Sequence, residues 1–381
     1  MIPTCKPWLP GKEKEYVINA IDTNWISSSG DYIDKFEKKF ADFCGNKYGI
    51  SCSSGLGALH LACSALNLKK CDEVIVPTFT MAASINSIIF TGAKPVLVDA
   101  DKDTYCIDVK KIEEKITKNT KAIMPVHIYG HPCDMDEIMK LARKYDLYII
   151  EDAAEGHGAE YNGRKVGSIG DVGCFSFYAN KILTTGEGGM CTTNNKDIAE
   201  RIKRLRNHAF DLPRFIHNEI GFNYRLTNIQ AAIGLAQVEN VNMLVEARRN
   251  VGVRYNKRLK GIKGLILPIE KSYVKNVYWM YGIVLTNEVK YSKEEVMQKL
   301  KDLGVETRSF FIPMHKQPAY INKVVENVPD CIGSFPVSDK ISKRGFYIPS
   351  SSNISDKEIE YICNSIGDIL NIKGIHKEKI R

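Results

Sequence analysis

Residues 48–99, YGISCSSGLGALHLACSALNLKKCDEVIVPTFTMAASINSIIFTGAKPVLVD, contain the pattern that decides the fold class. Three short apolar runs occur in this stretch, at residues 48–52, 73–77 and 95–99, and two apolar helical patterns separate them. Apolar runs without polar alternation are typical of strands buried on both faces. We therefore predict an α/β fold in which helices cover both faces of a mainly parallel sheet.

The same alternation continues to residue 152. It predicts a helix around residues 109–116, a strand at 121–126, a helix at 135–145 and a strand at 147–152. Beyond it come short strands with glycine turns, a helical region at residues 228–259, and a mixed α+β pattern. We expect residues 1–245 to form a large α/β domain with an N-terminal arm, and residues 246–381 a smaller α+β domain. Two units suit 381 residues at roughly 150 residues per domain.

The composition is that of an ordinary globular protein, with 44% hydrophobic and 26% charged residues. No apolar run approaches the roughly 20 residues that span a bilayer, and the N-terminus lacks the apolar segment of a signal peptide. We expect a soluble, non-exported protein. The net charge of +8 is spread along most of the chain, which favours a solvated surface over nucleic-acid binding.

The cysteines and paired histidines do not form a recognisable metal or disulfide pattern. The 11 cysteines are odd in number and none stands at CxxC spacing, which argues against a zinc ribbon, a redox pair or a secreted disulfide framework. We predict free thiols in a reducing compartment, the cytoplasm. His127 and His131 have HxxxH spacing, but this spacing aligns two imidazoles only on a helix, and here it follows a strand. We expect no metal site.

A glycine-containing turn, Ser53-Ser54-Gly55-Leu56-Gly57, joins the first predicted strand to its helix. Such a junction can present backbone N–H groups to a phosphate at the positive end of the helix, although it can equally be a tight turn alone. A dinucleotide fingerprint needs a third glycine three residues after Gly57 and an acid at the end of the next strand, and this chain has neither. A nicotinamide-dependent oxidoreductase is therefore the disfavoured alternative.

Two charged side chains follow later strands. Asp152 ends an apolar strand, where a carboxylate could bind magnesium, act as a base or hold a protonated ring nitrogen. It could equally only cap a helix or form a structural ion pair. Lys181 lies between an aromatic-rich strand and the turn TTGEGG. A lysine in such a place can be partly desolvated, which lowers its pKa and makes it a nucleophile that forms Schiff bases.

The stretch EDAAEGHGAEYNGRKVGSIGDVGCFSFYANKILTTGEGG, residues 151–189, resembles the core of the pyridoxal-phosphate-dependent sugar aminotransferases of the DegT/DnrJ/EryC1/StrS family. The resemblance extends over nearly the whole chain, including residues 25–37, 221–239 and 345–363. It implies a fold-type-I transferase with pyridoxal 5'-phosphate as cofactor. Residues 23–33 and 305–320 are most similar to the GDP-perosamine synthase branch.

The resemblance also implies roles for residues around the cofactor. Lys181 would form the Schiff base and then move a proton between cofactor and sugar. Asp152 would pair with the pyridinium nitrogen. Ser176 and the backbone at Gly55 and Leu56 would bind the phosphate.

Further residues are assigned only by the resemblance. Asn223 would reach the cofactor phosphate of a neighbouring subunit, which implies a homodimer with shared active sites. The candidates for the sugar-nucleotide pocket are Trp25, Arg308 and His315, for which core packing or surface pairing is the open alternative.

The chain departs from the family pattern at three cofactor-binding positions. Leu56 stands where threonine is usual, and Met81 where an aromatic residue commonly contacts the cofactor ring. Glu155 replaces the usual glutamine and adds a negative charge near the ring.

The implied reaction moves an amino group from glutamate to C4 of a nucleotide-linked 4-keto-6-deoxyhexose, in O-antigen or polysaccharide biosynthesis. GDP-perosamine is the first expected product, and a UDP- or dTDP-linked 4-amino sugar of the viosamine type is the alternative. A dehydrating branch of the family has histidine in place of the Schiff-base lysine, so Lys181 argues against it.

Overall fold

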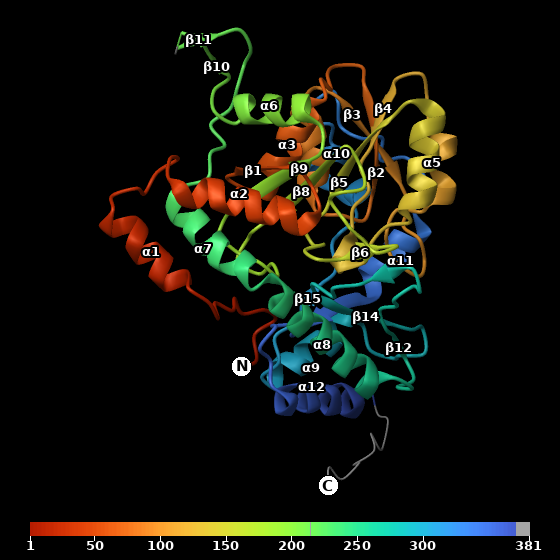
Figure 1. Ribbon diagram of the computed structural model, residues 1–381. Coiled ribbons are helices and arrows are strands. Elements are labelled where there is room, and N and C mark those ends of the chain that lie inside the picture. Colours follow the sequence, from red (N-terminus) through yellow and green to blue (C-terminus); the bar gives the residue numbers. More distant parts are fainter. Residues whose placement is uncertain (214, 371–381) are drawn as a thin grey trace.

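A seven-stranded sheet forms the centre of the protein in the computed structural model, which describes residues 1–213 and 215–370 (Figure 1). Its strand order is β1-β9-β8-β5-β4-β2-β3. Only β9 runs antiparallel to its neighbours, so the predicted α/β fold with a mainly parallel sheet is confirmed. The strands are β1 (Tyr48–Cys52), β2 (Glu73–Pro77), β3 (Lys94–Val98), β4 (Thr120–Ile123), β5 (Tyr148–Asp152), β8 (Val172–Ser176) and β9 (Gly189–Thr193).

Helices cover both faces of this sheet. On one face lie α3 (Gly55–Ala65), α4 (Ala82–Ile89) and α6 (Lys196–Leu205), and on the other α2 (Asp31–Cys44), α5 (Met135–Tyr145) and α7 (Asn228–Glu239). Strand β2 shows why its sequence is apolar throughout. Val74 and Val76 pack in the core under α3 and α4, whereas Ile75 packs in the opposite core, because successive side chains alternate between faces.

The helix predicted for residues 109–116 is wrong. Two single 3₁₀ turns occupy this segment, η1 (Val109–Lys111) and η2 (Glu113–Lys115), and the chain is extended again at Ile116. Ile112 is the only fully buried side chain of the segment. A helix this short needs a continuous apolar face to hold it, and one buried residue does not provide it.

A second, smaller sheet of order β12-β14-β16-β15 lies beside the first and is antiparallel. Its strands are β12 (Leu265–Ile266), β14 (Tyr281–Leu285), β15 (Arg308–Ser309) and β16 (Gly345–Ile348). Helices α8 (Val241–Leu259), α9 (Lys293–Asp302) and α12 (Asp356–Ile369) contribute to its core. Helices α9 and α12 each begin with a capping box, Ser292 with Glu295 and Ser355 with Glu358.

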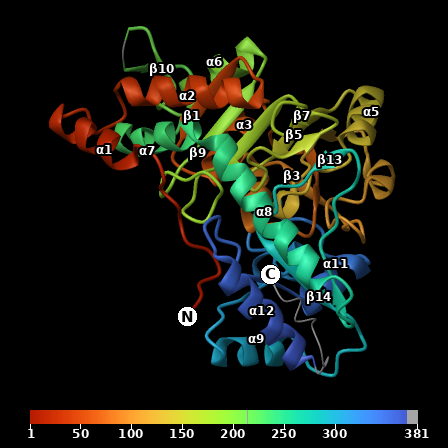
Figure 2. The same ribbon diagram turned by 60° about the horizontal axis from the view of Figure 1, so that its bottom comes forward.

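Helix α8 runs from the large sheet to the small one (Figure 2). The boundary predicted at residue 245 falls inside this helix, and the last part of the predicted second domain, residues 371–381, lies outside the described residues. The beginning of the N-terminal arm contacts the second unit, because Ile2 bridges to Val305 and the Thr4 N–H donates to Glu306 at 2.8 Å. The division at residue 245 stays a prediction.

The remaining elements surround these two units. Helix α1 (Glu13–Asp22) lies beside α7, and the hairpin of β10 (Phe210–Asp211) and β11 (Ile216–His217) projects from the large unit (Figure 1). The other short elements are β6 (Glu160–Tyr161), β7 (Arg164–Lys165), β13 (Val274–Lys275), η3 (Ile128–Gly130), η4 (Met314–Lys316), α10 (Pro318–Ile321) and α11 (Pro336–Arg344). Over the described ranges, none of the helices combines the length and apolarity required to traverse a membrane.

Candidate active site

The predicted site residues of β5 and β8 lie at one edge of the large sheet. Asp152 ends β5 and Ser176 ends β8, and these two strands are parallel neighbours in which Asp152 lies opposite Cys174. Lys181 follows β8 and lies in a turn. Its own backbone N–H donates a hydrogen bond to the Tyr178 carbonyl at 2.9 Å. The carboxyl ends of parallel strands are where α/β sheets bind ligands.

The start of α3 and the end of β8 form a cradle of hydrogen-bond donors. Gly55 and Leu56 are the first two residues of α3, and their backbone N–H groups have no protein acceptor within the described residues. The next N–H, that of Gly57, donates to the N-cap Ser54 Oγ at 3.0 Å. A Cβ at Gly55 would lie 2.7 Å from the Ser176 Cβ, so only glycine lets the helix approach this serine. Two backbone N–H groups and the Ser176 hydroxyl are therefore available to a phosphate, which fits a phosphorylated cofactor.

Asp152 is buried and held by two donors. Its Oδ2 accepts a hydrogen bond from Ser84 Oγ at 2.7 Å, and its Oδ1 accepts one from the Ala154 N–H at 3.2 Å. Burial raises the pKa of the Asp152 carboxyl, while these hydrogen bonds and the Lys181 charge oppose the rise. A carboxylate so fixed can hold a proton on a ring nitrogen placed against it.

Lys181 is also buried, with 10% of its side chain exposed. Its Nζ lies 3.7 Å from the centre of the Trp279 ring and 3.9 Å from Glu155 Oε1. Burial lowers the pKa of the Lys181 amine, whereas the negative charges of Glu155 and Asp152 raise it. The neutral amine is the nucleophilic form, so the site has the chemistry of a reactive lysine.

Glu155 completes this group of charges. Its Oε2 accepts a hydrogen bond from the Tyr129 N–H at 2.6 Å, and its Oε1 faces Lys181. Burial raises the pKa of Glu155 to about 7, against the opposing effects of the Lys181 charge and the Tyr129 N–H. The structure thus brings Asp152, Glu155 and Lys181 together.

Three further predicted residues, Met81, Trp25 and Arg308, come from other segments of the chain. Met81 precedes α4 and is more than half exposed. Trp25 is exposed in the loop after α1, and Arg308 on β15 lies 3.8 Å from Glu306. In the described ranges no hydrogen bond or ion pair joins Trp25 or Arg308 to Lys181.

His315 is buried between two partners. Its Nδ1 accepts a hydrogen bond from the Thr78 hydroxyl at 2.8 Å, and its Nε2–H donates to Asp339 at 3.0 Å. The ring also stacks on Phe335 at 4.4 Å. Both ring nitrogens are therefore engaged within the chain, which favours the packing alternative for this residue.

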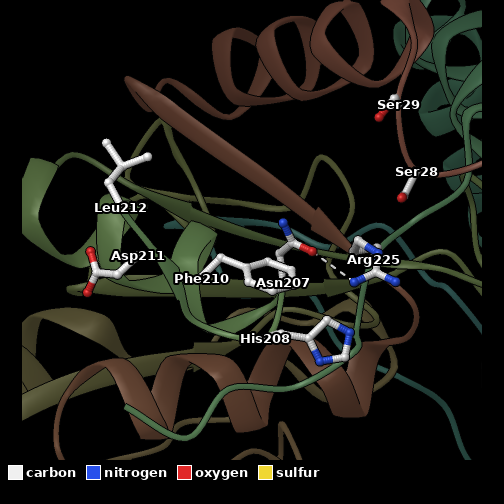
Figure 3. A pocket seen from close by; sticks show the side chains of 8 residues that line it. All are labelled: Ser28, Ser29, Asn207, His208, Phe210, Asp211, Leu212 and Arg225. Carbon is white, nitrogen blue, oxygen red and sulfur yellow. Dashed lines mark hydrogen bonds between the residues drawn. The ribbon is translucent and has the colours of Figure 1, made fainter. Parts of the chain in front are cut away.

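Asn223 is exposed, on the strap that follows the projecting hairpin. Its backbone bridges to Asn207, whose Oδ1 accepts a hydrogen bond from Arg225 Nη1 at 2.8 Å. Figure 3 shows this pair in a surface cavity of about 620 Å³, with Ser28 and Ser29 approaching from the loop between α1 and α2. The rest of the lining is His208, Phe210, Asp211 and Leu212.

The histidines of the HxxxH spacing have structural partners. His127 Nδ1 accepts a hydrogen bond from the Cys133 N–H at 3.1 Å, so its Nε2 carries the proton and donates to Glu151 at 3.1 Å. Glu151 also accepts three backbone N–H groups, from Gly167, Ile169 and Gly170. Among the described residues there is no group of three or more side chains that could hold a metal ion.

Two residues that contact the site, Ser84 and Trp279, were not predicted from the sequence. Ser84 holds Asp152, and it is itself within 2.7 Å of the Thr80 hydroxyl. Trp279 covers Lys181, and its indole N–H donates to the Asn180 carbonyl at 2.9 Å. Position could have suggested Ser84, a polar residue in the first turn of the apolar helix α4, but nothing local connects Trp279 to Lys181.

Comparison with known proteins places this arrangement among sugar aminotransferases. A sequence model described as the DegT/DnrJ/EryC1/StrS aminotransferase family matches residues 9–367. The chain is 43% identical over 373 residues to GDP-perosamine synthase of Escherichia coli O157:H7, covering 98% of this chain and 99% of the relative. It is 42% identical over 371 residues to GDP-perosamine synthase of Caulobacter vibrioides, covering 97% and 98%.

Solved structures show the same similarity in three dimensions. The crystal structure of DesV from S. venezuelae matches with a TM-score of 0.87 at 30% identity, over 94% of each chain. A putative sugar aminotransferase from Streptococcus pneumoniae in its PLP form matches with a TM-score of 0.90 at 26% identity, over 97% of this chain and 98% of the other.

Proposed function

The chain belongs to the DegT/DnrJ/EryC1/StrS aminotransferase family, and from this premise we propose that it transfers an amino group from glutamate to C4 of a nucleotide-linked 4-keto-6-deoxyhexose. The observation that carries the proposal is the identity of 43%, 42% and 40% to three GDP-perosamine synthases, over nearly the full length of both chains. GDP-linked sugar is accordingly the first candidate substrate, and GDP-perosamine the candidate product.

A dTDP-linked sugar is the second candidate. The chain is also 39% identical over 361 residues to dTDP-3-amino-3,6-dideoxy-alpha-D-galactopyranose transaminase of Aneurinibacillus thermoaerophilus. This relative has a different nucleotide and a different amino position in its name, so the family fold alone does not select the sugar.

The enzymes of this family depend on pyridoxal phosphate, which confirms the predicted cofactor and removes the nicotinamide alternative. When bound, pyridoxal phosphate supplies an aldehyde that takes up the amino group and a ring that accepts the electron pair released at the neighbouring carbon. The donor cradle at Gly55, Leu56 and Ser176 suits its phosphate, and the Asp152 carboxylate suits its ring nitrogen.

Lys181 supplies the amine that holds the cofactor covalently. The same Nζ then takes a proton from one carbon and returns it to another, which is why the lysine must release and regain its own proton near neutral pH. Burial lowers the pKa of the Lys181 amine, whereas the adjoining Trp279 ring and the Glu155 charge favour its ammonium form and oppose this shift.

The departures from the family pattern change the contacts without removing them. Leu56 offers its backbone N–H but no hydroxyl to the phosphate. Met81 places a thioether where an aromatic ring is usual, and a thioether on a π face is worth about 0.3–1.5 kcal/mol.

We place the cofactor site in a homodimer whose subunits share it. Asn223 is exposed and its side chain has no partner in the described part of this chain, which suits contact with a second copy. Leu212, which follows β10, and Ile220, which follows β11, are 92% and 87% exposed, so this part of the surface offers apolar side chains to a second copy. Trp25, Arg308 and His315 remain candidates for holding the nucleotide or orienting the sugar.

A cytoplasmic location and a role in O-antigen or polysaccharide biosynthesis complete the proposal. All 11 cysteines are free thiols, 7 of the 11 being buried in the large unit, as expected in a reducing compartment.

One experiment tests both the proposed reaction and the nucleotide of its sugar substrate. The cofactor-loaded enzyme is first converted to its amine form with glutamate, and is then offered GDP-, UDP- and dTDP-linked 4-keto-6-deoxyhexoses while the cofactor absorbance is followed. We expect the GDP-linked sugar to restore the original spectrum fastest. Restoration by another nucleotide sugar alone would correct the substrate, and restoration by none would refute the function.

A further inference from the structure

Among the described residues, one carboxylate lies within ion-pair distance of Lys181 Nζ, and it belongs to Glu155 rather than to Asp152. Both oxygens of Asp152 accept hydrogen bonds, from the Ser84 hydroxyl and the Ala154 N–H. Glu155 Oε1, by contrast, lies 3.9 Å from Nζ and accepts no hydrogen bond in the described ranges. The oxygen that is free to take a proton therefore belongs to Glu155.

The backbone fixes Glu155 in this orientation. Its Oε2 accepts the Tyr129 N–H at 2.6 Å, and Tyr129 has a φ of 54°, a conformation rarely adopted by a residue with a side chain. Such a conformation persists only where the surrounding structure holds it. One oxygen is thus occupied by the backbone, which leaves the other directed at the lysine.

The groups that face Glu155 come from several elements. Asp152 ends β5, Cys106 follows β3, and the Tyr129 and Tyr347 phenols come from η3 and β16. Lys181 is the one cation among the groups that act on this carboxyl in the described chain. The proton of Glu155 is therefore governed by the state of Lys181.

We propose that Glu155 is the proton partner of Lys181, a step that rests on the proposed function in which Lys181 is the reacting amine. The Lys181 ammonium gives one proton to Glu155 Oε1: an N–H bond breaks, its electron pair stays on nitrogen, and an O–H bond forms. The products are a neutral amine and a neutral carboxylic acid, so neither member of the pair keeps a buried charge. When Lys181 is released from the cofactor as a free amine, the proton returns from Glu155 Oε1 to Lys181 Nζ.

The geometry and energetics of the pair suit this transfer. The distance of 3.9 Å exceeds a hydrogen bond by about 1 Å, which a rotation of the lysine chain or one bridging water closes, and catalytic contacts are commonly longer before ligands bind. Burial disfavours both charges, so moving the proton relieves both together.

The test compares Glu155→Gln with Glu160→Gln in the cofactor-loaded enzyme. Glu160 is a matched control because it lies 3.7 Å from Lys165 in a similar pair but takes no part in the site. The rate of the half-reaction with glutamate and the absorbance of the cofactor–lysine linkage are each measured from pH 5 to pH 9.

We expect the wild type and E160Q to show an inflection near pH 7 in the half-reaction. E155Q should lose this inflection and react about 100-fold more slowly at neutral pH, which is the lower end of the roughly 10²–10⁴-fold that proton transfer by a positioned side chain contributes. An E155Q enzyme with the wild-type rate and inflection would overturn the proposal.

A second variant keeps the test decisive if E155Q does not bind cofactor. Glu155→Asp retains a carboxyl, and it should keep the inflection at a reduced rate; loss of the inflection in a folded E155D would also overturn the proposal. A wild type that does not react with glutamate at all would instead show that the proposed function is wrong.

Discussion

Ser84→Ala removes the hydrogen-bond donor that holds Asp152, and the expected loss of kcat/KM follows from the structure. Because an ionised carboxylate can only accept, Ser84 must donate its one proton to Asp152, and Thr80 in turn donates to Ser84. Deleting the hydroxyl leaves Oδ2 buried with no donor. Hydrogen bonds to charged groups contribute roughly 1.5–3 kcal/mol, which corresponds to about a 10- to 100-fold loss of kcat/KM if the bond is needed in the transition state.

The pH dependence of this variant has a definite sign. Burial already raises the pKa of Asp152, and losing Ser84 raises it further, so the acid limb of the rate profile should move to higher pH. A carboxyl whose pKa is raised on folding destabilises the fold increasingly as pH rises from its unfolded pKa through its folded pKa. The stability difference between wild type and S84A should therefore be small near pH 3 and larger at neutral pH.

The assay measures kcat/KM for the complete transamination between pH 5 and pH 9, and urea unfolding of the cofactor-free chain at matched pH values. Ser87→Ala is the control, since Ser87 is buried on the same helix but donates to the Ser84 carbonyl, at 2.9 Å, rather than to Asp152. An S84A enzyme that matches S87A in rate, pH profile and stability would refute the reasoning.

The remaining predictions concern the cofactor and the dimer. Lys181→Ala should lower turnover by at least about 10³-fold, measured with saturating cofactor, since the amine and its proton transfer are both lost; retained turnover would remove the lysine from the mechanism. Asp152→Asn should reduce the rate about 100-fold or more with an unchanged circular dichroism spectrum, because the amide keeps the shape but not the charge. Gly55→Ala should weaken cofactor binding, seen by equilibrium dialysis, because the new Cβ would lie 2.7 Å from that of Ser176. Mixing inactive Lys181→Ala with Asn223→Ala should restore activity as subunits exchange, since one site of the mixed dimer has both residues; no recovery in proven mixed dimers would contradict shared sites.

Local pattern was sufficient for the large sheet and for the ends of its strands. Continuous apolar runs marked the strands because both faces are covered, as Val74, Ile75 and Val76 demonstrate. The position of Asp152 at a strand end and of Gly55 at a strand–helix junction followed from the same reasoning. The same reasoning wrongly predicted a helix at residues 109–116. Apolar spacing alone does not reveal that Ile112 is the only side chain of this segment that is buried in a core.

Contacts between distant segments could not be predicted in this way. Ser84 and Asp152 are 68 residues apart, and the Trp279 indole bonds to a carbonyl 99 residues away beside Lys181. His315 was predicted as a substrate residue from resemblance, yet its ring nitrogens meet Thr78 and Asp339. The contacts of Trp279 and His315 depend on how the second unit packs against the first, and that of Ser84 depends on how α4 packs against β5 within the large unit. No local period encodes either arrangement.

The central claim is the transfer of nitrogen to C4 of the sugar, and isotope labelling tests it most directly. The cofactor-loaded enzyme is incubated with ¹⁵N-glutamate and a GDP-linked 4-keto-6-deoxyhexose, and the product is examined by NMR for coupling between ¹⁵N and the sugar carbons. The account predicts the label on C4 with one 2-oxoglutarate formed per labelled sugar. Label on another carbon, or a sugar recovered without ¹⁵N, would contradict it.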